Sequence, residues 1–247
     1  MDGRSGSRMV WTLKSVFPSS ETRRRRYRDE QLLLEWNTCS KMASSSRDDN
    51  RLAPFNPTHE SSIDVAIDLL QLQSSDILFD LGCGDGRMLL RAASQVDGLR
   101  CVGIELDESL AARGRENMDM AKRSADKAAL ADRVEIRHGD VLAELKTMGQ
   151  LAPATASTSI GEQSNRKLSL LDDATTVFVY LLPQGLKQVK ILLEEAAKRR
   201  RREKTNTGDN EMKQFRVASY MFQIPDWIPV QVDRSGKGSC PIYLYHL

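Results

Sequence analysis

The sequence lacks three features that mark common functional classes. Its four cysteines are widely spaced and form no Cys-x-x-Cys pair, which argues against a zinc site and indicates free thiols in a reducing compartment. No apolar run approaches the roughly 18 residues that a membrane-spanning helix needs. The formal net charge is only +2, so no overall positive field points to a nucleic acid partner. We therefore expect neither a metal site nor a membrane span.

The length and composition fit one α/β domain with additional polar segments. Of the 247 residues, 40% are apolar, a slightly low fraction that predicts sizeable polar stretches outside the core. We assign residues 52–247 to the domain. Within it, the polar stretches at about 151–167 and 199–211 are predicted to be mobile inserts.

Residues 1–51 form a separate basic segment that is rich in serine and carries the run Arg23–Arg26. Two interpretations stay open. Its acidic residues favour a disordered basic tail, whereas its positive charge and serines are also typical of a mitochondrial presequence. Met42 resembles an alternative translation start, which would remove the tail. The compartment is accordingly mitochondrial or cytoplasmic.

The most informative stretch places a glycine-rich turn between an apolar strand and a helix. The strand covers Ile77–Leu81, the turn contains Gly82, Gly84 and Gly86, and a helix begins near Arg87. Alternating glycines let the backbone take positive φ and approach a ligand closely. A strand, a glycine turn and a helix N-terminus together predict a cofactor site.

The residues around this turn favour a cationic cofactor over a dinucleotide. A dinucleotide site needs Gly-x-Gly-x-x-Gly, but here the third glycine comes one place early and Arg87 stands where that pattern needs glycine. Asp80 at the mouth of the turn would repel a pyrophosphate. S-adenosylmethionine (SAM) carries a sulfonium and an ammonium and no phosphate. The stretch resembles the first motif of the class I SAM-dependent methyltransferases, Asp/Glu-x-Gly-x-Gly-x-Gly, which Asp80, Gly82, Gly84 and Gly86 match.

Two further acids follow predicted strands and are candidate cofactor ligands. Glu105 ends the strand 99–105 and lies 21 residues after Gly84, the spacing at which an acid reaches ribose hydroxyls. The alternative is a solvated helix cap. Asp140 follows the strand 133–138, where the resemblance implies a contact to the adenine amine, and a helix N-cap is the alternative.

The pattern of strands and helices predicts the fold class. We expect an α/β, Rossmann-like, seven-stranded and mostly parallel sheet with helices on both faces and an antiparallel C-terminal hairpin. Besides the strands named above, the expected strands are 175–183, 215–222, and a hairpin of 227–232 with 241–245. Thr58 is the expected N-cap of a helix from His59 to about Leu72.

Four motifs in order carry a more specific resemblance. They are Pro54–Thr58, Asp80–Gly86, Gly103–Glu105 and Tyr180–Pro183. Over about residues 52–232 the chain resembles the mitochondrial protein-lysine methyltransferases of the ATP synthase c subunit and the ADP/ATP translocase, with their prokaryotic relatives. The resemblance implies methyl transfer from SAM to an amine nitrogen, with a protein lysine as the substrate.

The same motifs supply candidate substrate residues. We predict that the substrate channel is lined by Phe55, Pro57, Thr58, Leu181 and Pro183. An apolar channel lowers the pKa of a lysine by disfavouring its charged form. Tyr180 is the catalytic candidate, because its hydroxyl can orient the amine, and core packing of its ring is the alternative.

Three other functions remain open from the sequence. The first is a methyltransferase that acts on RNA or on a small molecule, although the Asn-Pro-Pro-Tyr type motif of amino-directed nucleic acid enzymes is absent and Tyr180–Pro183 stands in its place. The second is a non-catalytic interaction protein with the SAM fold, which the intact glycine motif argues against. The third is a dinucleotide dehydrogenase, which Arg87 disfavours.

Overall fold

The computed structural model describes residues 57–124, 128–143, 167–207 and 214–247. Several predictions fall outside these residues: the tail or presequence at 1–51, the start at Met42, the channel residue Phe55, and nearly all of the insert at 151–167. The fold is therefore described from Pro57 onward.

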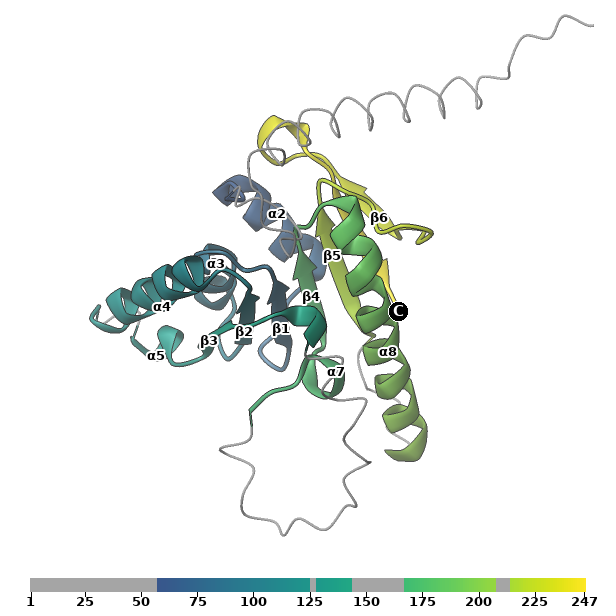
Figure 1. Cartoon of the computed structure of the whole chain (residues 1–247), viewed down its shortest axis with the longest axis horizontal. Coiled ribbons are helices and arrows are strands. Elements are labelled where there is room, and N and C mark those ends of the chain that lie inside the picture. The colour runs from purple at the N-terminus through teal and green to yellow at the C-terminus, as the bar shows by residue number, and fades with distance from the viewer. Residues whose placement is uncertain (1–56, 125–127, 144–166, 208–213) are drawn as a thin grey trace, which may run out of the picture. The chain divides into compact units, whose positions relative to one another are not determined.

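A single seven-stranded sheet organises the described chain (Figure 1). The strands are β1 Ile77–Leu81, β2 Arg100–Glu105, β3 Val134–His138, β4 Thr176–Val179, β5 Arg216–Tyr220, β6 Gln231–Asp233 and β7 Ile242–His246. Their order is β3-β2-β1-β4-β5-β7-β6. Neighbouring strands from β3 to β5 pair in parallel, whereas β7 is antiparallel to β5 and to β6. This arrangement confirms the predicted fold class.

The centre of the sheet is formed by near-continuous apolar strands. Every residue of β1 and of β4 is buried, as expected for parallel strands covered on both faces. In the register, Leu81 lies beside Ile104 on one side and beside Val179 on the other. The carboxyl ends of β1, β2 and β4 therefore meet at one edge of the sheet, where ligands bind in open α/β sheets.

Helices α2 Glu60–Leu70 and α3 Arg87–Gln95 pack against each other and against the sheet. The N-cap of α2 differs from the prediction: His59 is the cap, and its Nδ1 accepts a hydrogen bond from the Ser61 N–H. Thr58 instead has its side chain against the pocket described below. The cap therefore leaves Thr58 available to line a ligand site.

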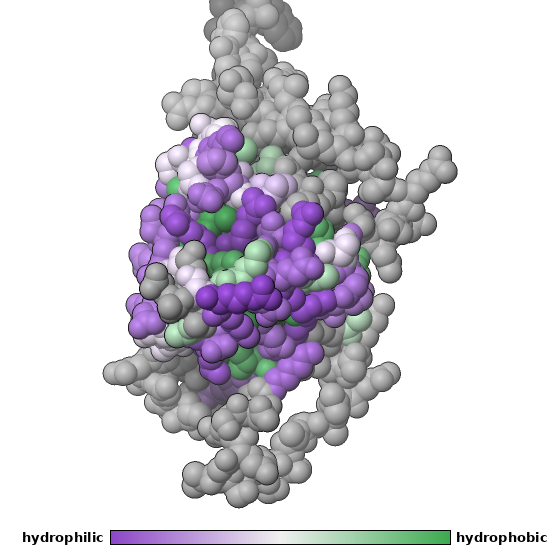
Figure 2. Space-filling model, turned by 90° about the vertical axis from the view of Figure 1, so that its left-hand side faces the viewer, coloured by the Kyte–Doolittle hydropathy of each residue, from purple (hydrophilic) through white to green (hydrophobic). Residues whose placement is uncertain are grey.

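The remaining helices are α4 Glu108–Lys122, α5 Ala128–Ala131, α7 Leu170–Asp173 and α8 Pro183–Thr207, with a short 3-10 turn at Lys237–Ser239. The Asp107 side chain caps α4 by accepting from the N–H groups of Ser109 and Leu110. The side of the molecule that carries α4 is largely hydrophilic, with small apolar areas between the polar groups (Figure 2). None of the helices in the described ranges is long and apolar enough to cross a membrane.

Three boundaries differ from the sequence predictions. β4 ends at Val179, and Pro183 starts α8 rather than ending the strand, as its fixed φ favours at a first helical position. Helix α8 continues to Thr207, well into the polar stretch at 199–211 that the sequence set apart as an insert, because no glycine or proline interrupts residues 186–207 and arginine favours helix. β6 begins only at Gln231, after Asp226 takes a left-handed φ of 64°.

Candidate cofactor site

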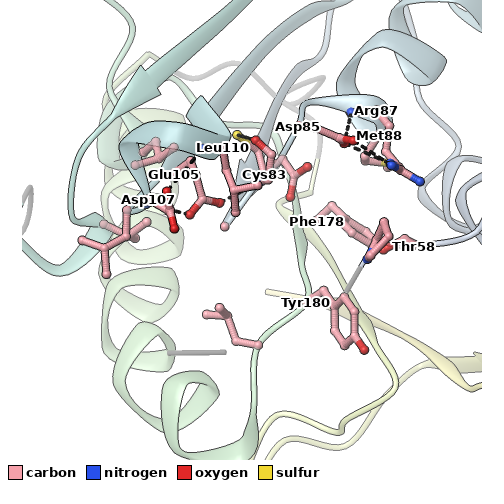
Figure 3. Close-up of a pocket in the computed structure, with 18 of the residues that line it drawn as sticks. Thr58, Cys83, Asp85, Arg87, Met88, Glu105, Asp107, Leu110, Phe178 and Tyr180 are labelled. Atoms are coloured by element: carbon pink, nitrogen blue, oxygen red, sulfur yellow. Dashed lines mark hydrogen bonds and ion pairs between the residues drawn. The ribbon is translucent and has the colours of Figure 1, made fainter. Parts of the chain in front are cut away.

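A pocket lies where the strands end (Figure 3). Its walls come from the segment before α2, the turn after β1, the end of β2, the segment after β3 and the end of β4. In Figure 3 Glu105 and Asp107 lie on one side of this pocket, and Thr58, Phe178 and Tyr180 lie on the other. The pocket thus has an acidic side and an aromatic side.

The glycine turn takes the predicted backbone conformation. The φ angles of Gly82, Gly84 and Gly86 are +83°, +54° and +76°, values that side chains rarely adopt. Gly82 and Gly84 line the pocket. Gly86 faces the other way: a Cβ there would come within 2.5 Å of the Ile136 Cδ1 atom. In this structure Gly86 therefore packs the turn against β3, and its direct contact to a cofactor stays a prediction.

Glu105 joins the end of β2 to the glycine turn. Its Oε2 accepts a hydrogen bond from the Gly84 N–H at 2.8 Å, and its Oε1 accepts one from the Asp107 N–H at 2.9 Å. The residue is 8% exposed and lines the pocket. Because each carboxylate oxygen has a second lone pair, these backbone contacts leave acceptor capacity for a pair of ligand hydroxyls.

Asp80 is the most deeply buried acid of the pocket, with 2% of its surface exposed. Burial raises the pKa of Asp80 well above its ordinary value, and the negative charges of Glu105 and Asp85 raise it further. A buried carboxylate needs a positive partner to be stable in its charged form. The electrostatics at this position therefore favour a cationic ligand.

Asp85 and Arg87 form an ion pair at the rim of the pocket, a feature that the sequence analysis missed. The Arg87 Nε and Nη2 atoms donate to the two Asp85 carboxylate oxygens at 2.9 and 2.6 Å. Burial opposes ionisation of Asp85, but the hydrogen bonds and charge of Arg87 outweigh it and lower the pKa of Asp85. The sequence signal for this ion pair was an acid and a base on either side of Gly86, at positions 85 and 87.

Asp140 lies on the pocket wall and also organises its own backbone. Its Oδ1 accepts a hydrogen bond from the Leu142 N–H at 2.8 Å, which is the local capping role that the sequence left open. Gly139 and Val141 line the same wall. Asp140 lies on the pocket wall, where it could reach a cofactor, and its contact with an adenine amine remains a prediction.

Tyr180 lines the aromatic side of the pocket, and its contacts include Tyr220 and Met221. Its ring packs edge-on against Tyr220, with 4.9 Å between ring centroids. Its hydroxyl donates a hydrogen bond to the Met221 Sδ atom at 3.0 Å. Phe178 from β4 adds a buried ring beside the half-buried Tyr180. Neither Phe178 nor Met221 was singled out from the sequence, because both read as ordinary core residues of strands.

The predicted channel residues separate into two groups. Pro57, Thr58 and Leu181 line the pocket together with the cofactor candidates. Pro183 starts α8 and is not among the lining residues, and Phe55 lies outside the described residues. Within the described ranges, no group of three or more His, Cys, Asp or Glu side chains could hold a metal ion.

Comparison with curated proteins gives two relatives. A protein-lysine N-methyltransferase of Saccharolobus islandicus is 25% identical over 194 residues, which cover 78% of this chain and 92% of that protein. A probable cobalt-precorrin-6B C(15)-methyltransferase (decarboxylating) of Pyrobaculum calidifontis is 36% identical over 85 residues, 33% of this chain and 40% of that protein. No family model matches the chain.

Comparison with solved structures adds the fold. An RNA methyltransferase from Salinibacter ruber, solved in complex with S-adenosyl-L-homocysteine, is 26% identical with a TM-score of 0.51, and the match covers 77% of this chain and 93% of that one. The chain is a class I SAM-dependent methyltransferase. SAM is the cofactor of that class, and the pocket of this methyltransferase lies where the fold binds ligands.

Proposed function

We propose that this methyltransferase transfers the methyl group of SAM to the side-chain amine of a lysine in a protein. The observation that carries the proposal is the division of one pocket into an acidic side, with Glu105 and Asp107, and an aromatic side, with Phe178 and Tyr180. The relative from Saccharolobus islandicus, which bears the name protein-lysine N-methyltransferase and matches over 92% of its length, supports the choice of substrate.

The acidic side fits the polar groups of SAM. Glu105 would accept hydrogen bonds from the ribose hydroxyls, Asp140 would accept from the adenine amine, and Asp80 would face the ammonium. Gly82 and Gly84 take a positive φ and carry no side chain, so the cofactor can approach the backbone of the turn closely. When bound, SAM supplies a methyl carbon already activated by the adjacent sulfonium. The domain at 52–247 would then be the catalytic unit.

The aromatic side fits the acceptor. A lysine must lose its proton before its nitrogen can attack, and an apolar surrounding lowers the lysine pKa. Phe178 and Leu181 are nearly fully buried and supply that surrounding. The reaction then needs the nitrogen held about 3–3.5 Å from the methyl carbon and in line with the bond that breaks. Tyr180 and Thr58 are the polar side chains on this side of the pocket that can hold it.

The test uses SAM labelled in its methyl group and a fractionated cell lysate, with and without ribonuclease. We expect label in a protein band, insensitive to ribonuclease, and its position at a lysine when the peptides are mapped by mass spectrometry. A Glu105→Ala enzyme run beside the wild type shows whether the labelling depends on the cofactor site. Label confined to RNA or to small molecules would refute the lysine assignment.

A second candidate is methylation of RNA, which the likeness to the Salinibacter ruber enzyme favours. A basic run, Arg199–Arg202, is present in α8. It begins 16 residues after Pro183, however, which places it about 24 Å along the helix from the pocket end. Arg199 is also paired with Asp172 and Glu195. The ribonuclease arm of the lysate experiment separates the two candidates.

A further inference from the structure

The wall of the cofactor pocket carries an uneven distribution of charge. Among the described residues that line it, five are acids: Asp80, Asp85, Glu105, Asp107 and Asp140. In the same part of the wall Arg87 is the one cation. SAM is not purely cationic, because its methionine part carries a carboxylate next to the ammonium. Among five acids that carboxylate would be repelled unless a positive group received it.

The place of Arg87 in the pocket fits the carboxylate. In Figure 3 Arg87 and Glu105 lie on opposite sides of the pocket. The glycine turn runs from one to the other, since the Gly84 N–H donates to Glu105 and Arg87 follows three residues later. In SAM the ribose and the carboxylate are also at opposite ends, with the sulfonium between them. A cofactor with its ribose at Glu105 can therefore reach Arg87 with its carboxylate.

The Arg87 guanidinium is held in place and still has donors for a ligand. Its Nε and Nη2 atoms donate to the two Asp85 carboxylate oxygens, at 2.9 and 2.6 Å. A guanidinium has five N–H donors in a planar fork, and this ion pair uses two of them. Within the described ranges the other three have no hydrogen-bond acceptor. A second carboxylate can thus bind another edge of the same fork.

We propose that Arg87 receives the carboxylate of the cofactor and makes this methyltransferase select SAM over analogues that lack that group. Asp85 is a positioning residue, because its two contacts keep the guanidinium at the rim of the pocket. The inference deepens the proposed function and rests on its placement of the ribose beside Glu105. It does not depend on the acceptor, so it applies to a lysine and to RNA alike.

The contact should act on binding and not on the chemical step. Methyl transfer moves the methyl carbon from sulfur to the acceptor, the electrons of the broken carbon–sulfur bond stay on sulfur, and the carboxylate is unchanged. An interaction that is equally strong in the ground state and in the transition state lowers KM without raising kcat. The effect of losing Arg87 should therefore fall on the KM for SAM rather than on kcat.

The experiment measures the binding of two ligands by isothermal titration calorimetry, without any acceptor. The ligands are SAM and decarboxylated SAM, which keeps the adenine, ribose, sulfonium and ammonium and lacks the carboxylate. The wild type should bind SAM roughly 10- to 100-fold more tightly than decarboxylated SAM, the range expected for hydrogen bonds between charged groups. Arg87→Gln should weaken SAM binding by a similar factor and should bind decarboxylated SAM no more weakly than the wild type does.

Arg91→Gln is the matched control on the same helix. Arg91 binds both carboxylate oxygens of Asp64 in a similar fork, at 2.8 and 3.0 Å. Its side chain is 44% exposed, against 42% for Arg87, and it does not line the cofactor pocket. The Arg91→Gln enzyme should therefore keep the wild-type preference for SAM. Retained binding of decarboxylated SAM shows in each variant that the protein is folded.

The Glu105→Ala enzyme separates this inference from the proposal on which it rests. Both ligands carry the ribose, so the loss of Glu105 should weaken both by the same factor. Equal affinity of the wild type for the two ligands would overturn the role of Arg87, as would equal losses of both in Arg87→Gln or the same loss of preference in Arg91→Gln. Unchanged affinity of Glu105→Ala for both ligands would instead overturn the placement of the ribose.

Discussion

The Oε2 atom of Glu105 accepts the Gly84 N–H at 2.8 Å, and this contact links the end of β2 to the turn after β1. The same carboxylate therefore holds the glycine turn in shape and stands on the wall where ribose hydroxyls would bind. A single substitution at Glu105 should affect both the order of the turn and the affinity for SAM.

Glu105→Ala should weaken SAM binding by about 1.5–3 kcal/mol, the usual contribution of hydrogen bonds to a charged group. Isothermal titration calorimetry measures the change. Glu108→Ala is the matched control, because Glu108 begins α4, has a side chain that is 57% exposed and does not line the pocket. Equal affinity of the Glu105→Ala and Glu108→Ala enzymes would remove Glu105 from the site.

Asp80 should make SAM binding depend on pH. Its pKa is raised by burial and then by Glu105 and Asp85, so without ligand its contribution to stability is full below the unfolded pKa of about 3.9 and is lost as pH rises through the folded value. A bound cation favours the charged carboxylate. Below the raised pKa, SAM binding should therefore release a proton from Asp80, and affinity should rise with pH across that interval.

Calorimetry in two buffers of different ionisation enthalpy measures the proton released by Asp80. Asp80→Asn keeps the shape of the side chain but cannot ionise. The Asp80→Asn enzyme should therefore bind SAM more weakly than the wild type, and its SAM binding should release fewer protons, by the amount that Asp80 supplies in the wild type. Identical proton release in the wild type and in Asp80→Asn would show that Asp80 does not titrate on binding.

Gly86→Ala should lower stability far more than cofactor affinity. The new Cβ would meet Ile136 Cδ1 at 2.5 Å, and the backbone φ of +76° suits few side chains, so we expect a loss of about 1–3 kcal/mol in the free energy of unfolding. Gly139→Ala is the control, because no atom lies within 4 Å of its added Cβ. Denaturant midpoints of the two variants measure the difference.

Local patterns in the sequence were sufficient to predict the strands and the cofactor turn, because these features depend on residues that are close together in the chain. The apolar runs gave the five parallel strands, and the spacing from Gly84 to Glu105 placed that acid beside the turn, as the hydrogen bond between them now shows. The ends of elements were less predictable. The N-cap of α2 was assigned to Thr58, but His59 fills it, since an imidazole nitrogen can accept a backbone N–H as a hydroxyl oxygen does.

Contacts between distant segments were beyond the reach of the sequence. Tyr180 and Met221 are 41 residues apart and meet only because β4 and β5 are adjacent in the sheet. The left-handed backbone of Met221 has no signal in the sequence either, because methionine is a poor candidate for positive φ. The contact of Tyr180 with Met221 was therefore visible only after the strands had been placed side by side.

The final prediction concerns the boundary at residues 51 and 52. In the part of the chain that the structure describes, the seven-stranded sheet and the pocket wall are built from residues at or beyond Pro57, so we expect a chain that begins at Arg51 to fold and to bind SAM as tightly as the full chain. A chain that begins at Ser61 is the contrast: it keeps most of α2 but loses Pro57, Thr58 and the cap His59. Because Pro57 and Thr58 form part of the pocket wall, this shorter chain should bind SAM more weakly.

Calorimetry on the three chains tests both statements. Weaker binding by the chain that begins at Arg51 would mean that residues before 51 contribute to the cofactor site, and equal binding by all three would mean that the segment before α2 does not.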